Sequence, residues 1–271
     1  MPAQFNLDRT KSPQVGEPVE TDTVQLRDAS LAAAYYVPRR GGDFYDFLRV
    51  GTTRVLFVLL ECLDHSNENQ EVTSAVAATL REAGPRVFAA EDLNLAEAMI
   101  ELCLELNRTI LETGKARSCP AFAGCYEESL STLWYANAGH AAALIRDPAG
   151  VTELPATGLP LGLFSHTTCD ASAVVLQPGA ALLLVSRGVV EAKSHDREFG
   201  LEAVKATLRE TTSVIASEIC LSILARLHES SGPPPEPSDV TALALARSNT
   251  VKIESRASFG SPIRSTPPVE G

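Results

Sequence analysis

The chain has 271 residues, 45% hydrophobic and 21% charged, which is the composition of a globular protein long enough to bury a core. Its 23 basic and 34 acidic side chains give a net charge of −11, which argues against nucleic acid or an anionic membrane as the main partner. The sequence shows neither an apolar run of about 20 residues nor the apolar segment of a secretory signal. We therefore expect a cytoplasmic protein.

The six cysteines are scattered along the chain, without a CxxC pair or a Cys/His cluster at zinc-binding spacing. Such a low density of cysteines argues against a disulfide framework. We expect reduced thiols at all six positions, which are Cys62, Cys103, Cys119, Cys125, Cys169 and Cys220.

The composition divides the chain into three parts. Residues 1–28 are polar and show no periodicity, which predicts a flexible leader. Residues 248–271 are rich in Ser, Pro and Arg, which predicts a disordered tail. Residues 29–247 should form one domain, and they contain no internal repeat.

The first half of this domain should contain two strands and two helices. Leu31–Tyr36 and Arg54–Leu60 have the pattern of strands, and the second is apolar throughout, as in a strand buried on both faces. An apolar stripe at helical spacing predicts a helix over Glu71–Ala83. A second helix should begin after Asn94, which stands at capping-box spacing from Glu97, and end at Gly114.

Strands dominate the next part, and two helices precede the final strand. Turn-forming residues separate the predicted strands, which are Ala121–Tyr126, Thr132–Ala136, Ala142–Arg146, Ala173–Leu176 and Ala181–Val185. Periodicity predicts helices over Leu201–Glu210 and Ser213–His228, and a last strand over Val240–Ala246. Strands in blocks with helices in pairs favour an α+β fold of antiparallel sheets covered by helices over a doubly wound parallel sheet.

The segment Gly41-Gly42-Asp43-Phe44-Tyr45-Asp46 is the most informative motif. Two glycines allow a sharp turn, and the carboxylate that follows could point into a metal site at a sheet edge. The alternative is a tight turn with a solvated aspartate, and these six residues alone favour that alternative.

Further motifs follow in a fixed order: YANAGH at Tyr135–His140, GLPLGLF at Gly158–Phe164, SRGVVEA at Ser186–Ala192 and FGLE at Phe199–Glu202. With the glycine motif, they resemble the PPM-type metal-dependent serine/threonine phosphatases, in particular the bacterial SpoIIE/RsbU branch. The resemblance spans about Leu31 to Arg247. It implies an α-β-β-α sandwich, in which two antiparallel sheets are flanked by helices. It also implies two manganese or magnesium ions that activate a water to attack phosphoserine or phosphothreonine.

The resemblance assigns metal-ligand positions in the first half of the domain. Asp43 matches the first ligand, and Glu61 stands where the family has a second aspartate, so both are the candidate catalytic residues. The glycine that should follow the second ligand is replaced by Cys62. Asp64 could substitute for Glu61 if the loop shifts by three residues, and His65 matches a histidine of the family.

In the second half, the resemblance places an arginine at a ligand position. Arg187 replaces the third aspartate, and Ser238-Asp239 replaces a pair of aspartates, which leaves Asp239 as the remaining metal-ligand candidate there. A hard cation relies on anionic oxygen ligands and would meet a guanidinium instead. We therefore expect the two-metal site to be absent or impaired.

Three functions remain open on these residues. The first is an active phosphatase of this family that dephosphorylates a phosphoserine on a small regulatory protein such as an anti-sigma-factor antagonist, provided that Glu61, Asp64 or Asp239 re-form a metal site. The second is a pseudophosphatase that binds its partner without turnover, in which Arg187 either holds a phosphate bidentately or forms a salt bridge with Asp43 or Glu61. The third is a structural remnant whose surface matters more than its cleft. A homodimer is one of the oligomeric states left open.

Overall fold

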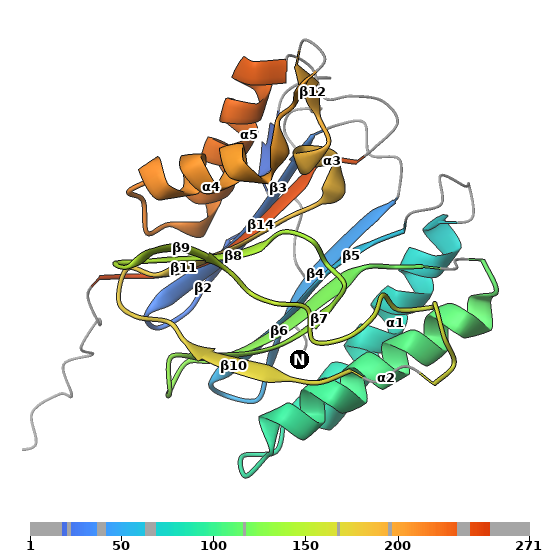
Figure 1. The fold of residues 1–271 in the computed structure, drawn as a ribbon. Helices are drawn as coiled ribbons and strands as arrows, with labels where there is room; N and C mark the ends of the chain where they lie inside the picture. Colours follow the sequence, from blue (N-terminus) through green and yellow to red (C-terminus); the bar gives the residue numbers. More distant parts are fainter. Residues whose placement is uncertain are drawn as a thin grey trace, which may run out of the picture.

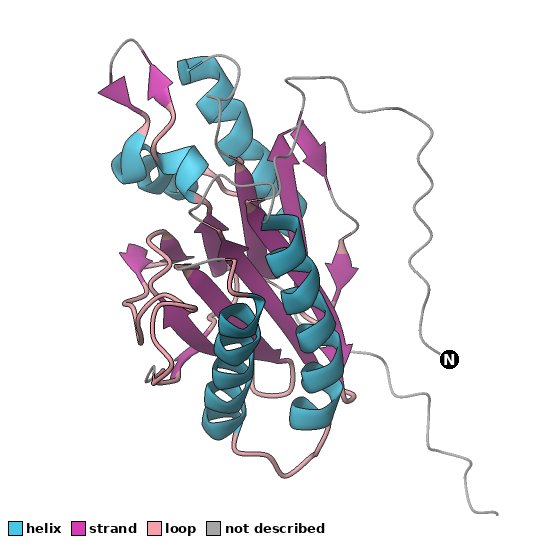
Figure 2. Ribbon diagram, turned by 90° about the vertical axis from the view of Figure 1, so that its right-hand side faces the viewer, coloured by secondary structure: helices cyan, strands magenta, loops and turns pink. Residues whose placement is uncertain are grey.

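The computed structural model describes residues 18–20, 23–36, 42–62, 69–115, 118–166, 169–194, 197–231 and 239–249. Two antiparallel sheets face each other, and each is covered on its outer side by a pair of helices (Figures 1 and 2). This arrangement is the α-β-β-α sandwich that the sequence predicts.

The five-stranded sheet has the strand order β10-β7-β6-β5-β4. Helices α1 (Asn69–Phe88) and α2 (Leu95–Thr113) pack against it, at the lower right of Figure 1. Its strands are β4 (Asp43–Val50), β5 (Arg54–Glu61), β6 (Ala121–Glu127), β7 (Thr132–Ala138) and β10 (Ser172–Val175).

The seven-stranded sheet has the order β1-β3-β14-β11-β8-β9, with β2 also paired to β3. Its outer side is covered by α4 (Gly200–Glu210) and α5 (Ala216–Ser231), and a short helix α3 (Arg187–Val190) follows β11. A small hairpin of β12 (Lys193–Ser194) and β13 (Arg197–Glu198) precedes α4. The strands of the sheet are β1 (Pro18–Glu20), β2 (Val24–Gln25), β3 (Ala29–Tyr36), β8 (Ala143–Asp147), β9 (Gly150–Glu153), β11 (Ala181–Val185) and β14 (Thr241–Arg247).

The hydrophobic core has three layers, because the strands at the centre of each sheet are buried on both faces. Along β5, Leu56, Val58 and Leu60 pack against α1 and α2, whereas the alternate side chains lie between the sheets. The apolar run predicted as a doubly buried strand is therefore confirmed. Along β14, small alanines face α5 and leucines face the other sheet, so the helix can approach its sheet closely.

Gly124 on β6 shows how tightly the layer between the sheets is packed. A Cβ atom at this position would lie 2.3 Å from Cζ of Phe57, which crosses it from the neighbouring strand. The ring of Phe57 stacks on that of Phe122 in the same layer. Only glycine leaves space for the Phe57 ring.

Two helix boundaries differ from the prediction. Helix α1 continues to Phe88 through Gly84 and Pro85, because Val87 and Phe88 are buried in the core. Gly84 does not end the helix, and it allows close contact with Leu48 and Leu56. Helix α5 begins at Ala216 and not at Ser213, and Ile215 before it is 43% exposed.

Other expectations have mixed outcomes. Asn94 caps α2 by accepting from the amides of Ala96 and Glu97, and Gly114 ends it with φ of 63°, as predicted. Strand β4 is not predicted from the sequence, which indicates only a turn around Asp43 in this segment. Within the expected leader, residues 18–20 and 24–25 pair with β3, while residues 1–17 and 250–271 lie outside the described residues.

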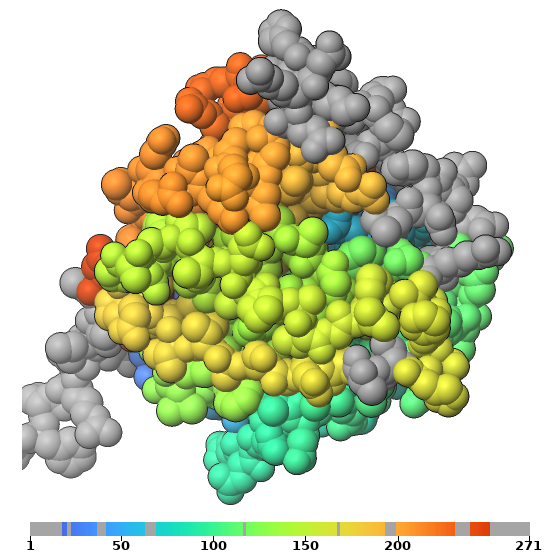
Figure 3. Space-filling model, viewed as in Figure 1, coloured from blue at the N-terminus to red at the C-terminus, as the bar shows by residue number. Residues whose placement is uncertain are grey.

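All six cysteines are buried and have free thiols. None of the helices in the described part of the chain has the length and apolar character needed to cross a bilayer. The long connection between β9 and β10 crosses the middle of the face shown in Figure 3. It pairs with the end of the five-stranded sheet through a bridge between Cys119 and Leu161.

Candidate functional site

Three carboxylates meet where the ends of β4 and β5 approach the start of β14. Asp43 and Glu61 are opposite each other in the β4–β5 register. Asp239 precedes β14, and its Oδ2 accepts hydrogen bonds from the backbone N–H groups of Gly42 at 2.8 Å and Asp43 at 3.0 Å. All three residues are at least nine-tenths buried, with exposures of 8, 5 and 7%. The structure thus brings together the three predicted metal-ligand candidates.

Both carboxylate oxygens of Glu61 already face protein groups. The backbone N–H of Arg187, at the start of α3, donates to Oε2 at 2.6 Å. Oε1 lies 2.9 Å from Nδ1 of His140, whose side chain is fully buried. The ring nitrogens of His140 make no aligned hydrogen bond in the described structure, so this is a close contact between the imidazole and the carboxylate.

His140 was quoted in the YANAGH motif but was not predicted as a site residue. It lies just after β7, where its backbone N–H donates to the side-chain Oδ1 of Asn137 at 2.8 Å. Gly139 between them has φ of 75°, and a Cβ there would lie 2.8 Å from Cγ of Pro160. The sequence signal that could have identified His140 is its spacing from Asn137 and Gly139. This spacing is typical of a tight turn, and the turn directs the imidazole inward.

Two hydroxyl residues of the seven-stranded sheet complete the site. Oγ of Ser186 accepts from the N–H of Thr241 at 3.0 Å and donates to the backbone oxygen of Asp239 at 3.3 Å. Ser186 and Thr241 are fully buried, and they connect the end of β11 to the start of β14. Asp239 and the start of β14 are therefore fixed relative to the start of α3.

The carboxyl group of Asp43 has a raised pKa. Burial raises the pKa of its carboxyl group to about 7, and the neighbouring charges of Glu61 and Asp239 act in the same direction. The neighbouring side chains of Thr241 and Ser186 oppose part of this rise. An aspartate in a solvated turn, the alternative favoured by the motif alone, is wrong because Asp43 is buried.

Arg187 contacts the carboxylate cluster through its backbone N–H, whereas its side chain lies outside the cluster. Nε of the guanidinium pairs with Oε1 of Glu191 at 2.5 Å, one turn further along the chain, and the side chain is 54% exposed. The salt bridge considered between Arg187 and Asp43 or Glu61 is thus replaced by a bond from the Arg187 amide to Glu61. Its cause is the start of α3, where backbone N–H groups lack helical partners.

The carboxylates do not fit the two-metal centre that the family resemblance implies. Manganese and magnesium need several anionic oxygens directed at the ion. Here Oε2 of Glu61 and Oδ2 of Asp239 accept amide protons, and Oε1 of Glu61 faces an imidazole. Within the described ranges, no group of three or more His, Cys, Asp or Glu side chains could hold a metal. Asp64, His65 and Ser238 lie outside those ranges.

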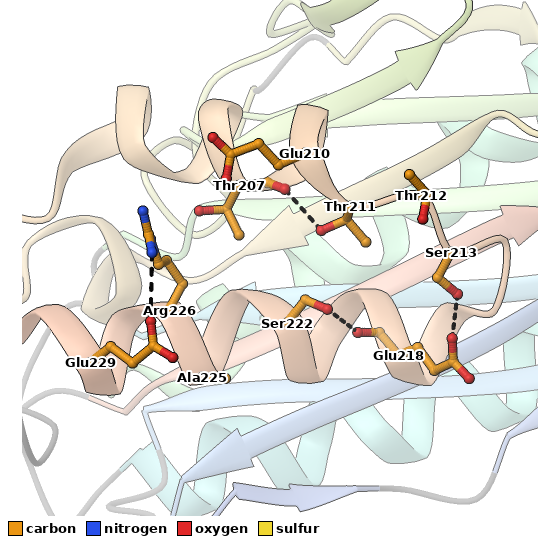
Figure 4. Close-up of a pocket in the computed structure, with 10 residues that line it drawn as sticks. All are labelled: Thr207, Glu210, Thr211, Thr212, Ser213, Glu218, Ser222, Ala225, Arg226 and Glu229. Carbon is orange, nitrogen blue, oxygen red and sulfur yellow. Dashed lines mark hydrogen bonds and ion pairs between the residues drawn. The ribbon is translucent and has the colours of Figure 1, made fainter.

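A separate hollow of about 420 Å³ lies between α4 and α5 (Figure 4). Four of its hydroxyl groups donate to neighbouring protein oxygens: Thr207 to Ala203, Thr211 to Thr207, Ser222 to Glu218, and Ser213 to the Glu218 carboxylate. Arg226 and Glu229 form an ion pair at its other end. None of the three clustered carboxylates lines this hollow.

The family model of stage II sporulation protein E (SpoIIE) matches residues 52–248, which is most of the chain. The chain belongs to the SpoIIE family. The match covers Glu61, His140, Arg187 and Asp239, whereas Asp43 precedes it. No curated protein matches the chain significantly.

Solved structures place this SpoIIE-family chain among the PP2C phosphatase folds. The RsbU and RsbW domains of Rv1364c from Mycobacterium tuberculosis superpose with a TM-score of 0.68 at 24% identity, covering 83% of this chain and 61% of that chain. The SiaA-PP2C domain of Pseudomonas aeruginosa gives 0.66 at 20% identity, covering 80% and 85%.

The PP2C phosphatase domain of SpoIIE from Bacillus subtilis, with a fragment of its regulatory domain, gives a TM-score of 0.65 at 15% identity, covering 81% of this chain and 62% of that one. The chain therefore spans less than two thirds of the Mycobacterium tuberculosis and Bacillus subtilis chains that it matches. At these identities, the likeness establishes the fold.

Proposed function

We propose that this chain is a SpoIIE/RsbU-like serine/threonine phosphatase domain of partner-switching signalling in which metal-dependent hydrolysis is impaired or lost. One observation carries the proposal: Arg187 stands where the family has a ligand aspartate, and its guanidinium pairs with Glu191 at the surface. Arg187 therefore adds no anionic oxygen to the site, and Oε2 of Glu61 accepts the Arg187 backbone N–H instead. In the limiting case, the domain is a pseudophosphatase that binds its partner without turnover.

The proposed partner is a phosphoserine or phosphothreonine protein of the anti-sigma-factor-antagonist type. Support comes from the family and from its structural neighbours, one of which contains an RsbU and an RsbW domain. Another neighbour, with a TM-score of 0.53, is described as part of the bacterial stressosome. The net charge of −11 favours a partner surface with basic residues around the phosphorylated side chain.

Manganese titration of the full chain tests the proposal directly. We expect no tight uptake of two ions and no rise in melting temperature, whereas a bound ligand at a hundredfold excess over its Kd would add about 2.7 kcal/mol of stability. Hydrolysis of a phosphoserine peptide should stay near the rate without manganese. Two ions bound at micromolar manganese, together with rapid hydrolysis, would contradict the proposal.

A restoration experiment separates missing ligands from a displaced scaffold. The triple variant Glu61→Asp, Arg187→Asp and Ser238→Asp returns the aspartates of the family and should gain manganese uptake and manganese-dependent hydrolysis. The single changes should gain little, because the ligands of one site act together. The matched control is Arg187→Ala in place of Arg187→Asp, which removes the guanidinium without adding a ligand and should restore nothing. A folded triple variant without metal uptake would show that the loop after Glu61 is also displaced.

A further inference from the structure

Two of the six thiols lie side by side directly next to the carboxylate cluster. Cys62 follows Glu61 at the end of β5, and Cys119 precedes β6 on the neighbouring strand. Their Sγ atoms are 3.8 Å apart, with the Cys119 thiol donating to the sulfur of Cys62. This pair is independent of the proposed function.

The β5–β6 register places this pair where a cross-strand disulfide can form. The β5–β6 register ends with Leu60 opposite Ala121, so Cys62 and Cys119 oppose each other two residues further on. Their amides donate elsewhere, that of Cys62 to the oxygen of Gly42 and that of Cys119 to the oxygen of Leu161. Opposed antiparallel residues that exchange no backbone hydrogen bond have Cα atoms about 4.5 Å apart, within the range that a disulfide spans. Closing the bond would bring the two Sγ atoms from 3.8 Å to about 2.05 Å.

The other cysteines lack this arrangement. Cys125 and Cys220 are fully buried, and burial raises the pKa of both thiols, to about 12 for Cys125. Cys103 and Cys169 also interact through their thiols, but they lie on a helix and on a connecting segment, and not opposite each other on adjacent strands. Cys62 and Cys169 each keep 5% of their residue surface exposed, so the opposed position on adjacent strands is what sets the Cys62–Cys119 pair apart.

We infer that Cys62 and Cys119 form a peroxide-oxidisable thiol pair that closes to a disulfide between β5 and β6. The Cys62 sulfur attacks one peroxide oxygen, the O–O bond breaks, and a sulfenic acid and one water result. The Cys119 sulfur then attacks the Cys62 sulfur, the S–S bond forms, the S–O bond breaks, and the hydroxyl leaves as a second water with the Cys119 proton. Two thiols and one hydrogen peroxide thus give one disulfide and two waters. The product fixes the strand end that carries Glu61.

The test uses the full reduced chain, hydrogen peroxide, alkylation of remaining thiols and non-reducing peptide mass spectrometry. We expect the loss of two hydrogens and a tryptic cross-link between residues 55–81 and 118–146. Because the second peptide also contains Cys125, Cys125→Ser must retain the cross-link, whereas Cys119→Ser and Cys62→Ala must both lose it. The melting temperature of the wild type should rise by about 4 °C or more on oxidation and return on reduction.

Several results would overturn the inference. One is complete alkylation of Cys62 and Cys119 after peroxide, and another is their recovery as sulfinic acids without a cross-link. A cross-link confined to Cys103 and Cys169 would refute the assignment, as would equal oxidation of all six cysteines, which indicates unfolding. Because the cross-link is mapped in the wild type, the test holds even if one variant fails to fold.

Discussion

The two sheets contribute different chemistry to the carboxylate cluster. The five-stranded sheet supplies two opposed acidic residues, Asp43 on β4 and Glu61 on β5. The side of the seven-stranded sheet supplies one carboxylate, Asp239, together with hydrogen-bonding groups: the Arg187 amide and the hydroxyls of Ser186 and Thr241. In the resemblance to metal-dependent phosphatases, both sides would supply aspartates.

This difference shows how a buried group of acids is stabilised by the protein itself. A buried carboxylate is costly unless hydrogen-bond donors or cations surround it. Glu61 is bonded by an amide at a helix start, and Asp239 by two amides of the opposite sheet. The carboxylate of Asp43 is stabilised less by its neighbours, and its raised pKa is the result of this uncompensated burial.

The largest expected effect is at Asp239, whose carboxylate links the two sheets. Asp239→Ala should lower the free energy of unfolding by about 3 kcal/mol, because the amides of Gly42 and Asp43 lose their acceptor. Asp239→Asn keeps an acceptor oxygen and should cost about 1 kcal/mol. Urea denaturation measures both. Equal stability of the alanine variant and the wild type would show that these bonds do not stabilise the fold.

Asp43→Asn should stabilise the protein, with a gain that depends on pH. The pKa of Asp43 rises from 3.8 in the unfolded reference to about 7 in the folded chain, so the folded state holds the proton more tightly. The wild type therefore loses stability from this group as pH rises from about 4 to 7. The full shift corresponds to about 4 kcal/mol, and the variant should gain about half of this at pH 8, because the amide loses the interactions that favour the carboxylate; near pH 4 it should gain nothing.

The matched control for Asp43 is Asp46→Asn on the same strand. Asp46 lies outside the cluster and pairs with the exposed Arg81. Its neutralisation should bring no gain at pH 8. A gain of the same size in both variants would mean that net charge, and not the cluster, is responsible.

The smallest expected changes in stability distinguish the side chain of Arg187 from its backbone amide. Arg187→Ala removes an exposed pair with Glu191 and should change stability by less than about 0.5 kcal/mol. Arg187→Pro removes the amide that binds Glu61 and should cost about 1.5 kcal/mol, although proline is well tolerated as the first residue of a helix. If the alanine variant is the more destabilised, the guanidinium matters more than the amide.

Much of the fold follows from local patterns in the sequence. The apolar run of β5, the cap at Asn94 and the stop at Gly114 each depend on contacts within a few residues or on burial along one strand. These patterns therefore predict the strand and the second helix nearly to their ends. The order of the motifs also points to the family and to the three carboxylates.

Other features were decided by tertiary contacts. The predicted first helix ends at Ala83, but α1 continues to Phe88 because Val87 and Phe88 are buried in the core. The contact of His140 with Glu61 joins residues 79 positions apart in the chain, so no local pattern encodes it. At Arg187 the sequence shows a cation, whereas the fold uses the amide. Every residue except proline has such an amide, so only the three-dimensional structure reveals which one binds a carboxylate.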